Sequence, residues 1–283
     1  MLKIKDIRIH LKNCLGHQYP DNELRGFGNW ILEHLFDYTI TDALLNADRT
    51  LTEKNSSDLE FIIKHLKQEK PIQQIVGYSW FYGRKFLLNE HVLIPRPETE
   101  ELVDWMLKDS LNDRSILEVG TGSGCIAITL ALNTNATIVS IDVSELALKQ
   151  AKTNALALNA SVAFCKADVL DDSSCESFGC FDVIVSNPPY VLESDKQMMS
   201  TNVLEYEPHL ALFVSSDDPL LFYRAIASMA TRKLNANGVL YFEIHENYGQ
   251  EALDMLSLKG FKELELRKDL QGKDRMVKAV WKL

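Results

Sequence analysis

The run "FDVIVSNPPY", from Phe181 to Tyr190, sets an amide, two prolines and an aromatic ring directly after a short apolar segment. Proline has no backbone N–H, so Pro188 and Pro189 would present carbonyl acceptors in a stiff turn without competing donors. The side chain of Asn187 adds one more carbonyl acceptor, and Tyr190 adds a flat ring that can stack on a planar group. Two converging acceptors match the two N–H bonds of a planar –NH2 group, so Asn187 to Tyr190 are the candidate catalytic residues.

A second candidate site is a glycine-rich turn in the run "LEVGTGSGCIAI". The turn consists of Gly120, Thr121, Gly122, Ser123 and Gly124. Glycine lets the backbone approach a ligand closely, and the helix that should follow offers unpaired N–H groups in its first turn. A dinucleotide-binding fingerprint would need a third glycine where Cys125 stands, which weakens the case for a bound pyrophosphate.

Two aspartates, Asp142 and Asp168, end the next two apolar segments. A carboxylate at the end of the second strand can accept both hydroxyls of a ribose, which is the role we expect for Asp142. Asp168 is placed to accept the exocyclic amine of adenine. Carboxylates around a glycine turn, without a basic phosphate clamp, suit a nucleoside that lacks phosphate, such as S-adenosyl-L-methionine with its positive sulfonium. The alternative is that both aspartates cap helices and that the glycines form a tight turn.

These two sites together predict the transfer of a methyl group to nitrogen. Amide and aromatic amine nitrogens are poor nucleophiles, because their lone pairs are delocalised. The site must align the lone pair with the S–CH3 bond and exclude water, and such positioning supplies roughly 7–11 kcal/mol in good cases. No dedicated general base is required, since the nitrogen becomes strongly acidic as it is methylated. For Asn187 to Tyr190, the alternative is a rigid turn that only ends a strand.

The second part of the chain alternates strands and helices in a pattern that would position both sites. We expect strands in "SILEVG", "TIVSID", "SVAFCKAD", "FDVIVS", "GVLYFEI", "FKELELRK" and "RMVKAVWKL", and helices from Cys125 to Asn133, from Ser144 to about Leu158, across "PLLFYRAIASMATRKL" and from about Tyr248 to Leu258. This alternation predicts a mostly parallel sheet with helices on both faces. Open sheets of this kind bind ligands at the carboxyl ends of their strands, where the glycine turn and Asn187 would meet.

The first part of the chain is predicted to be helical. Its apolar residues recur at helical spacing, and one helix should begin at Ser57 and end before Pro71. We predict a small helical bundle in residues 1–75 that docks the substrate, a β-hairpin linker in residues 76–90 around Gly83, and a catalytic domain in residues 91–283.

Composition limits the possible classes of protein. Of the 283 residues, 46% are hydrophobic and 25% are charged, as is typical of soluble globular proteins. No apolar run approaches the roughly 18 residues of a membrane span, and the first residues do not form a signal peptide, so we expect a cytoplasmic protein. The net charge of −10 argues against a large nonspecific nucleic-acid surface. The five cysteines form no C-x-x-C pair, so we expect neither disulfides nor a metal site.

The chain resembles the class I methyltransferases that modify amide or amine nitrogen, because it combines "NPPY" with "EVGTGSG". The runs "PIQQIVGYSWFYG", "VLIPRPETEELV", "EYEPHLAL" and "DLQGKDRMV" narrow this resemblance to the protein-(glutamine-N5) methyltransferases of peptide chain release factors. It covers nearly the whole chain, and it is more specific from Pro71 to the C-terminus than in the helical part.

The resemblance implies a fold and a reaction. The fold would be an α/β class I S-adenosylmethionine-dependent methyltransferase, with a Rossmann-like, seven-stranded, mostly parallel sheet and a small N-terminal helical domain. The donor would be S-adenosyl-L-methionine, the product S-adenosyl-L-homocysteine, and the acceptor the glutamine N5 in the Gly-Gly-Gln motif of class 1 peptide chain release factors. The family's donor site also includes the positions of Val169 and Asn187. The family usually has glycine where this chain has His245, which we interpret as a surface or strand-end residue rather than a catalytic one. We expect a monomer that binds neither DNA nor a membrane.

Three other functions remain open. A glutamine methyltransferase of a ribosomal protein shares the Asn-Pro-Pro-Tyr run, although "IPRPETE" favours the release-factor type. An adenine-N6 nucleic-acid methyltransferase would have to flip its base and grip phosphates, which the acidic composition disfavours. A noncatalytic Rossmann-like binding module would not need Asn187 and Asp142.

Overall fold

The computed structural model describes residues 2–282, which divide into two compact units. The first unit contains residues up to Gly77 together with Ser200–Tyr206, and the second contains Tyr78–Met199 and the chain from Glu207 onward. Each unit has its own buried core. Among the described residues, no helix is long and apolar enough to cross a membrane.

The first unit is helical. Its helices are η1 (Ile4–Asp6), α1 (Ile7–Leu15), α2 (Asp21–Phe36), α3 (Ile40–Leu45), α4 (Glu53–Leu66), α5 (Ile72–Val76) and α9 (Thr201–Tyr206). Leu59 and Leu66 lie on one face of α4 because two helical turns separate them, and both are buried in the core of the unit. The predicted start of this helix at Ser57 is wrong, because Thr52 caps an earlier start by accepting the N–H of Asn55 at 3.1 Å.

A segment that is distant in sequence completes the first unit. The hydroxyl of Tyr206 donates to the carbonyl of Gln68 at 2.8 Å, and the side chain of Gln74 donates to the carbonyl of Tyr206 at 2.6 Å. These bonds fasten the end of α9 to the chain around α5. The domains predicted from the sequence, at residues 1–75, 76–90 and 91–283, did not place Ser200–Tyr206 in the helical unit.

The second unit is built on a seven-stranded sheet with the order β10-β11-β9-β6-β3-β4-β5. The strands are β3 (Ser115–Val119), β4 (Thr137–Asp142), β5 (Ala163–Lys166), β6 (Phe181–Ser186), β9 (Leu234–Glu243), β10 (Lys262–Lys268) and β11 (Asp274–Trp281). Neighbouring strands run parallel from β9 to β5, and β11 is antiparallel to both of its neighbours. The predicted seven-stranded, mostly parallel sheet is therefore confirmed.

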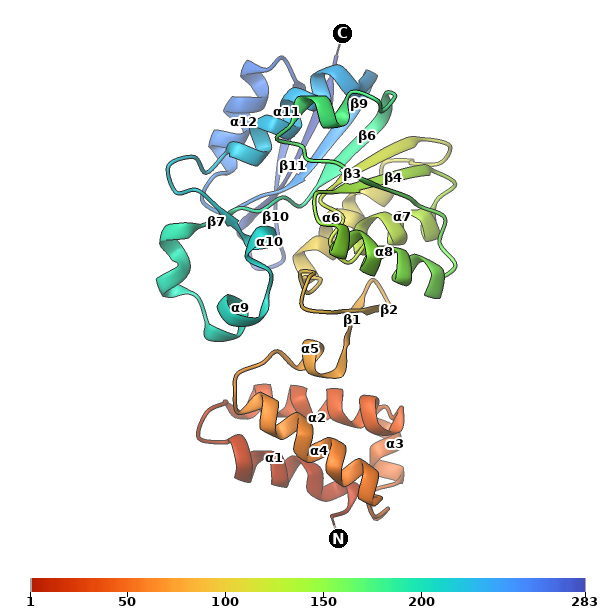
Figure 1. Ribbon diagram of the computed structural model, residues 1–283, viewed down its shortest axis with the longest axis vertical. Coiled ribbons are helices and arrows are strands. Elements are labelled where there is room, and N and C mark those ends of the chain that lie inside the picture. Colours follow the sequence, from red (N-terminus) through yellow and green to blue (C-terminus); the bar gives the residue numbers. More distant parts are fainter. Residues whose placement is uncertain (1, 283) are drawn as a thin grey trace. The chain divides into compact units, whose positions relative to one another are not determined.

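Alternate residues of the central strands face opposite sides of this sheet. In β6, Ile184 packs in one core cluster, whereas Val183 and Val185 pack in the other. The cluster around Ile184 is covered by α11 (Leu221–Lys233) and α12 (Gly249–Leu258), and the other by α6 (Pro97–Leu107), α7 (Cys125–Asn133) and α8 (Glu145–Ala157). Figure 1 shows these two sets of helices on either side of the strands. The apolar run Val183–Val185 of β6 follows from this burial on both faces.

The hairpin predicted around Gly83 is formed by β1 (Tyr78–Phe81) and β2 (Arg84–Leu87). Phe81 and Phe86 are fully buried in the same cluster as α6, so the hairpin belongs to the second unit. The remaining elements of this unit are η2 (Asp172–Cys175), β7 (Val191–Leu192), η3 (Glu193–Met198), α10 (His209–Leu212) and β8 (Phe213–Val214). The segment from β7 to β8 has no counterpart among the elements predicted from the sequence.

Candidate active site

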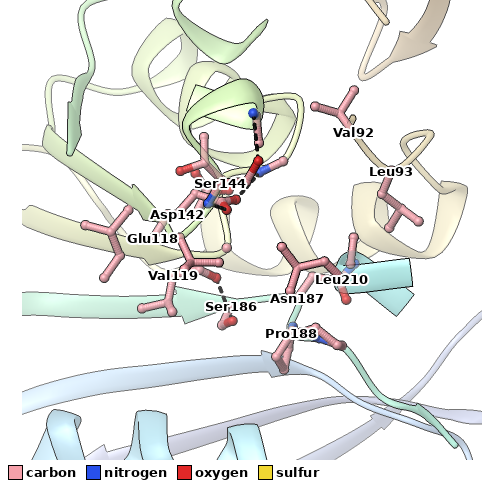
Figure 2. A pocket seen from close by; sticks show the side chains of 18 of the residues that line it. Val92, Leu93, Glu118, Val119, Asp142, Ser144, Ser186, Asn187, Pro188 and Leu210 are labelled. Atoms are coloured by element: carbon pink, nitrogen blue, oxygen red, sulfur yellow. Dashed lines mark hydrogen bonds between the residues drawn. The ribbon is translucent and has the colours of Figure 1, made fainter. Parts of the chain in front are cut away.

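A cavity of about 330 Å3 lies at the carboxyl ends of the central strands. Its lining includes the glycine turn after β3 (except Gly124), Asp142 at the end of β4, Asp168 after β5 and Asn187 after β6. Every lining residue belongs to the second unit. Figure 2 shows Asp142 and Glu118 grouped on one side of the cavity, and Asn187 and Pro188 on the other. The structure therefore brings the two sites predicted from the sequence into one cavity.

The glycine turn has a backbone shape that residues with side chains rarely adopt. Gly120 and Gly124 have φ angles of +85° and +82°. A Cβ atom on Gly124 would lie 2.8 Å from Cδ1 of Ile128 and 3.1 Å from Cβ of Ala151, so glycine is needed for α7 to pack closely on α8. The N–H of Gly120 donates to the carbonyl of Ile141 at 2.9 Å. Packing and hydrogen bonding thus fix the turn at the wall of the cavity.

Asp142 is held by two backbone donors. Its Oδ2 accepts the N–H of Gly122 at 3.0 Å, and its Oδ1 accepts the N–H of Ser144 at 2.8 Å. A carboxylate has about four lone-pair sites, so each oxygen of Asp142 can accept a further bond from a ligand. Burial raises the pKa of Asp142, and the hydrogen bonds from Gly122 and Ser144 oppose that shift.

Asp168 and Val169 also line the cavity. Asp168 Oδ1 accepts the N–H of Leu170 at 2.9 Å, and the backbone N–H of Asp168 donates to the hydroxyl of Ser174 at 2.8 Å. One oxygen of Asp168 thereby shapes the loop after β5, while its carboxylate stays at the wall of the cavity. Val169 adds an apolar surface to the same wall.

Glu118 also lines the cavity, although it was not predicted from the sequence. It lies near the end of β3 and is 1% exposed. Its Oε2 accepts the hydroxyl proton of Ser140, whereas its Oε1 has no hydrogen-bond partner within residues 2–282. Burial raises the pKa of Glu118 to about 8. A buried, unpartnered carboxyl oxygen at the wall of a cavity fits a cationic group of a ligand, which would offset the cost of burying that oxygen. The signal in the sequence was the acidic residue two positions before Gly120.

Asn187 is held in one orientation by Thr99, which also lines the cavity, and through it by Glu243, which does not. Its Nδ2 donates to Oγ1 of Thr99 at 3.2 Å. Thr99, on α6, is 2% exposed, and its own hydroxyl donates to Oε2 of Glu243 at 2.6 Å. Burial raises the pKa of Glu243, and its hydrogen bonds oppose that shift. Oδ1 of Asn187 remains as an acceptor, and Pro188 and Pro189 line the same cavity. Neither Thr99 nor Glu243 carries a local signal of this role in the sequence.

Tyr190 is not among the residues that line the cavity. Its hydroxyl donates to Oε1 of Glu243 at 2.9 Å, and its ring stands edge-on to the ring of His245, with centroids 6.0 Å apart. His245 follows the end of β9, and burial lowers its pKa. Tyr190 thus anchors the turn from behind, and its stacking on a substrate stays a prediction.

Two further contacts hold the cavity walls together. The side chain of Asn154, on α8, donates to the carbonyl of Ser123 at 2.9 Å and to that of Leu87 at 3.0 Å, which ties the glycine turn to the hairpin. Arg96 forms an ion pair of 2.5 Å with Glu207, whose side chain is 1% exposed. These partners are far apart in the sequence, so local patterns could not reveal them.

Two family models match the chain. A model described as a methyltransferase domain matches residues 111–281. A model described as the PrmC N-terminal domain matches residues 6–77. The two matches follow the division into a helical unit and a unit with a central sheet.

The chain is similar in sequence to named enzymes along almost all of its length. A protein of Flavobacterium psychrophilum (strain ATCC 49511 / DSM 21280 / CIP 103535 / JIP02/86), named release factor glutamine methyltransferase, is 44% identical over 282 residues, which cover 98% of each chain. A protein of the same name from Bacteroides thetaiotaomicron is 41% identical over 274 residues, covering 96% of this chain and 98% of that protein.

The fold is also similar to a solved structure. A methyltransferase from Pyrococcus furiosus matches with a TM-score of 0.54 and 16% identity, over 82% of this chain and 100% of that one. At this level of identity the likeness supports the class of fold alone.

Proposed function

This chain belongs to the release factor glutamine methyltransferase family, and on that premise we propose that it methylates the side-chain amide nitrogen of a glutamine in a class 1 peptide chain release factor. The methyl donor is S-adenosyl-L-methionine, and the glutamine is that of the Gly-Gly-Gln motif. Transfer forms an N–CH3 bond, breaks the S–CH3 bond, leaves S-adenosyl-L-homocysteine and releases one amide proton.

The main support for this proposal is that the two sides of one cavity differ in chemistry. Backbone and side-chain acceptors at Asn187 and Pro188 lie on one side, and the carboxyl groups of Asp142 and Glu118 lie on the other. The first wall suits an amide that must be oriented, and the second suits a cationic nucleoside. A site for methyl transfer from a sulfonium to an amide needs both.

We assign the donor to the glycine turn and the acidic wall. The donor supplies a methyl group on a positively charged sulfur. Each oxygen of Asp142 keeps room for one further hydrogen bond, which suits the two adjacent hydroxyls of a ribose. The unpartnered Oε1 of Glu118 suits a cationic group. Asp168 and Val169 would border the adenine.

We assign the acceptor amide to Asn187 and Pro188. Oδ1 of Asn187 and the carbonyl of Pro188 would each accept one N–H of the glutamine –NH2 group, which holds the plane of that group. The third direction of the nitrogen, along its lone pair, then faces the donor. Such positioning supplies roughly 7–11 kcal/mol in good cases. The nitrogen becomes strongly acidic as it is methylated, so its proton can leave without a dedicated base and reach solvent as the product is released.

We infer that the first unit docks the release factor. Every residue that lines the cavity comes from the second unit. The first unit exposes large apolar side chains, with Leu44 at 73%, Leu45 at 81% and Phe61 at 54%, which are available for contact with a protein substrate. We propose a monomer that acts in the cytoplasm, where translation takes place, without binding DNA or a membrane.

The direct test compares three acceptors side by side. The purified protein is incubated with S-adenosyl-L-methionine and a release factor, a ribosomal protein or DNA, and each product is analysed by mass spectrometry. We expect one added methyl group on the glutamine of the Gly-Gly-Gln motif of the release factor. Methylation of the ribosomal protein or of adenine, with no change in the release factor, would refute the proposed substrate.

A further inference from the structure

One buried carboxylate connects both ends of the Asn-Pro-Pro-Tyr turn. Glu243, at the end of β9, is 1% exposed. Its Oε2 accepts the hydroxyl proton of Thr99 at 2.6 Å, and its Oε1 accepts that of Tyr190 at 2.9 Å. Thr99 in turn accepts a hydrogen bond of 3.2 Å from Nδ2 of Asn187. The first and last residues of the turn are therefore tied to one group.

The directions of these hydrogen bonds follow from the chemistry of the groups. The hydrogen bonds from Thr99 and Tyr190 and the positive charge of Arg275 favour the ionised form of Glu243. An ionised carboxylate only accepts hydrogen bonds, and a threonine hydroxyl has a single proton. Since Thr99 donates that proton to Glu243, its oxygen can only accept from Asn187. Asn187 must therefore present its –NH2 group to Thr99, and its carbonyl oxygen is left for the cavity.

The orientation of this side chain matters for the acceptor. An asparagine side chain can turn by 180° with little change of shape, because its oxygen and nitrogen are of similar size. If Asn187 were reversed, its –NH2 group would face the –NH2 group of the substrate glutamine, and two donors cannot bond each other. Pro188 and Pro189, at the centre of the turn, have neither a backbone N–H nor a side-chain donor.

We propose that Glu243 is a positioning residue that, through Thr99, keeps the carbonyl oxygen of Asn187 directed at the acceptor amide, and that, through Tyr190, fixes the far end of the same turn. This inference rests on the proposed function, because it names what orients the acceptor in that reaction. Glu243 does not line the cavity, so it acts through its two hydroxyl partners rather than on the substrate.

The central experiment removes the hydroxyl that links Glu243 to Asn187. Thr99→Val keeps the shape of the side chain but cannot hold the –NH2 group of Asn187, whereas Thr99→Ser keeps the hydroxyl. Single-turnover methylation of a release factor with saturating donor should slow roughly 10- to 100-fold in Thr99→Val, as expected for a misplaced reacting group. Thr99→Ser should stay close to the wild-type rate.

Thr129→Val is the matched control. Thr129, on α7, is fully buried, and its Oγ1 has no hydrogen-bond partner among the described residues. It lies outside the lining of the cavity. This variant makes the same substitution at a buried threonine whose hydroxyl, unlike that of Thr99, makes no hydrogen bond to the described part of the chain and does not line the cavity, so we expect it to leave the methylation rate unchanged. Calorimetry of donor binding and thermal unfolding of each variant separate effects on donor affinity and on stability from effects on the rate.

Glu243→Gln covers the case in which Thr99→Val does not fold. A glutamine replaces one of the two carboxylate oxygens with an –NH2 donor, so only one of the two hydroxyls can still donate to position 243. The other hydroxyl must turn its proton away, which changes the hydrogen bonding at one end of the turn, and we expect slower methylation.

Three results would overturn the proposal. They are a wild-type rate in Thr99→Val or Glu243→Gln, an equal loss in Thr99→Val and Thr129→Val, and a Thr99→Ser variant that is as slow as Thr99→Val. Failure of the proposed function itself would look different, because the wild-type protein would then not methylate the release factor at all.

Discussion

Asn187→Asp tests the role of the turn with a change of almost no volume. It replaces Nδ2, which donates to Thr99 at 3.2 Å, with a second carboxylate oxygen. Thr99 donates its one hydroxyl proton to Glu243 at 2.6 Å, so it has none to offer the new carboxylate. The variant therefore places two carboxylates on either side of one hydroxyl group.

The expected loss can be worked out from these contacts. The missing hydrogen bond costs about 1 kcal/mol. Two unit charges about 6 Å apart repel each other by roughly 3 kcal/mol at an effective dielectric constant of about 20. The new side chain should turn away from Thr99 or take up a proton, and either change removes the oriented acceptor. If these effects remove about 3 kcal/mol of stabilisation from the transition state, methylation slows about a hundredfold.

Donor binding should respond differently from the rate. A carboxylate at position 187 would attract the positive sulfonium, so we expect Asn187→Asp to bind S-adenosyl-L-methionine as well as the wild type or better. Calorimetry measures that affinity. Quenched single-turnover reactions with saturating donor, followed by mass spectrometry of the release factor, measure the chemical step. Asn133→Asp is the control, because Asn133 donates to the carbonyl of Thr129 at 2.7 Å and lies outside the cavity.

Asn187→Ala completes the test. It removes the carbonyl acceptor without adding a charge, so it should also lose catalysis about a hundredfold while binding the donor normally. A near wild-type rate in Asn187→Ala would mean that the strand ends on Asn-Pro-Pro-Tyr for structural reasons alone. A loss of donor affinity in Asn187→Asp that accounts for the whole loss of rate would refute the orientation argument.

Three further predictions concern the donor site and the helical unit. Asp142→Ala should weaken donor binding by about 1.5–3 kcal/mol, because the ribose hydroxyls lose a charged partner; unchanged affinity in calorimetry would remove Asp142 from the site. Glu118, whose pKa burial raises to about 8, should become charged as the pH rises through that value, so the affinity of the wild type for the cationic donor should increase from about pH 7 to about pH 9 relative to Glu118→Gln. Calorimetry at several pH values checks this, and parallel curves for the two proteins would contradict it. A chain that begins at Tyr78 should bind the donor nearly as well as the full chain yet methylate intact release factor poorly, whereas full activity in the same mass-spectrometric assay would exclude a docking role.

Most of the fold of the second unit could be predicted from the sequence, because its strands and helices follow from local patterns of residues. Strand β6 is a six-residue segment in which apolar residues predominate, and its predicted ends coincide with Phe181 and Ser186. The cap at Ser144 was predicted as well, and its hydroxyl accepts the N–H of Ala147 at 3.2 Å. The start of α4 was misplaced, because several polar residues before the apolar face could each cap a helix and local pattern does not choose among them.

The sequence also indicated several residues of the candidate site, although Glu118 and Thr99 were not among them. The glycine turn, Asp142, Asp168 and Asn187 each follow a strand that could be recognised by itself. Since parallel strands end at one edge of a sheet, the fold class alone predicts that these residues meet. The cavity lining agrees with that expectation.

Only the tertiary structure decided what holds the site in place. Thr99 and Glu243 are 144 positions apart, and Arg96 and Glu207 are 111 apart. Each pair forms because a buried carboxylate must find a partner once water is excluded, and which groups become neighbours depends on the packing of whole elements. Sequence periodicity reports which face of one element is buried, but it carries no information about the element that covers it. For this reason Asn187 could be recognised from its neighbours in the chain, whereas the carboxylate that orients it appeared only in the fold.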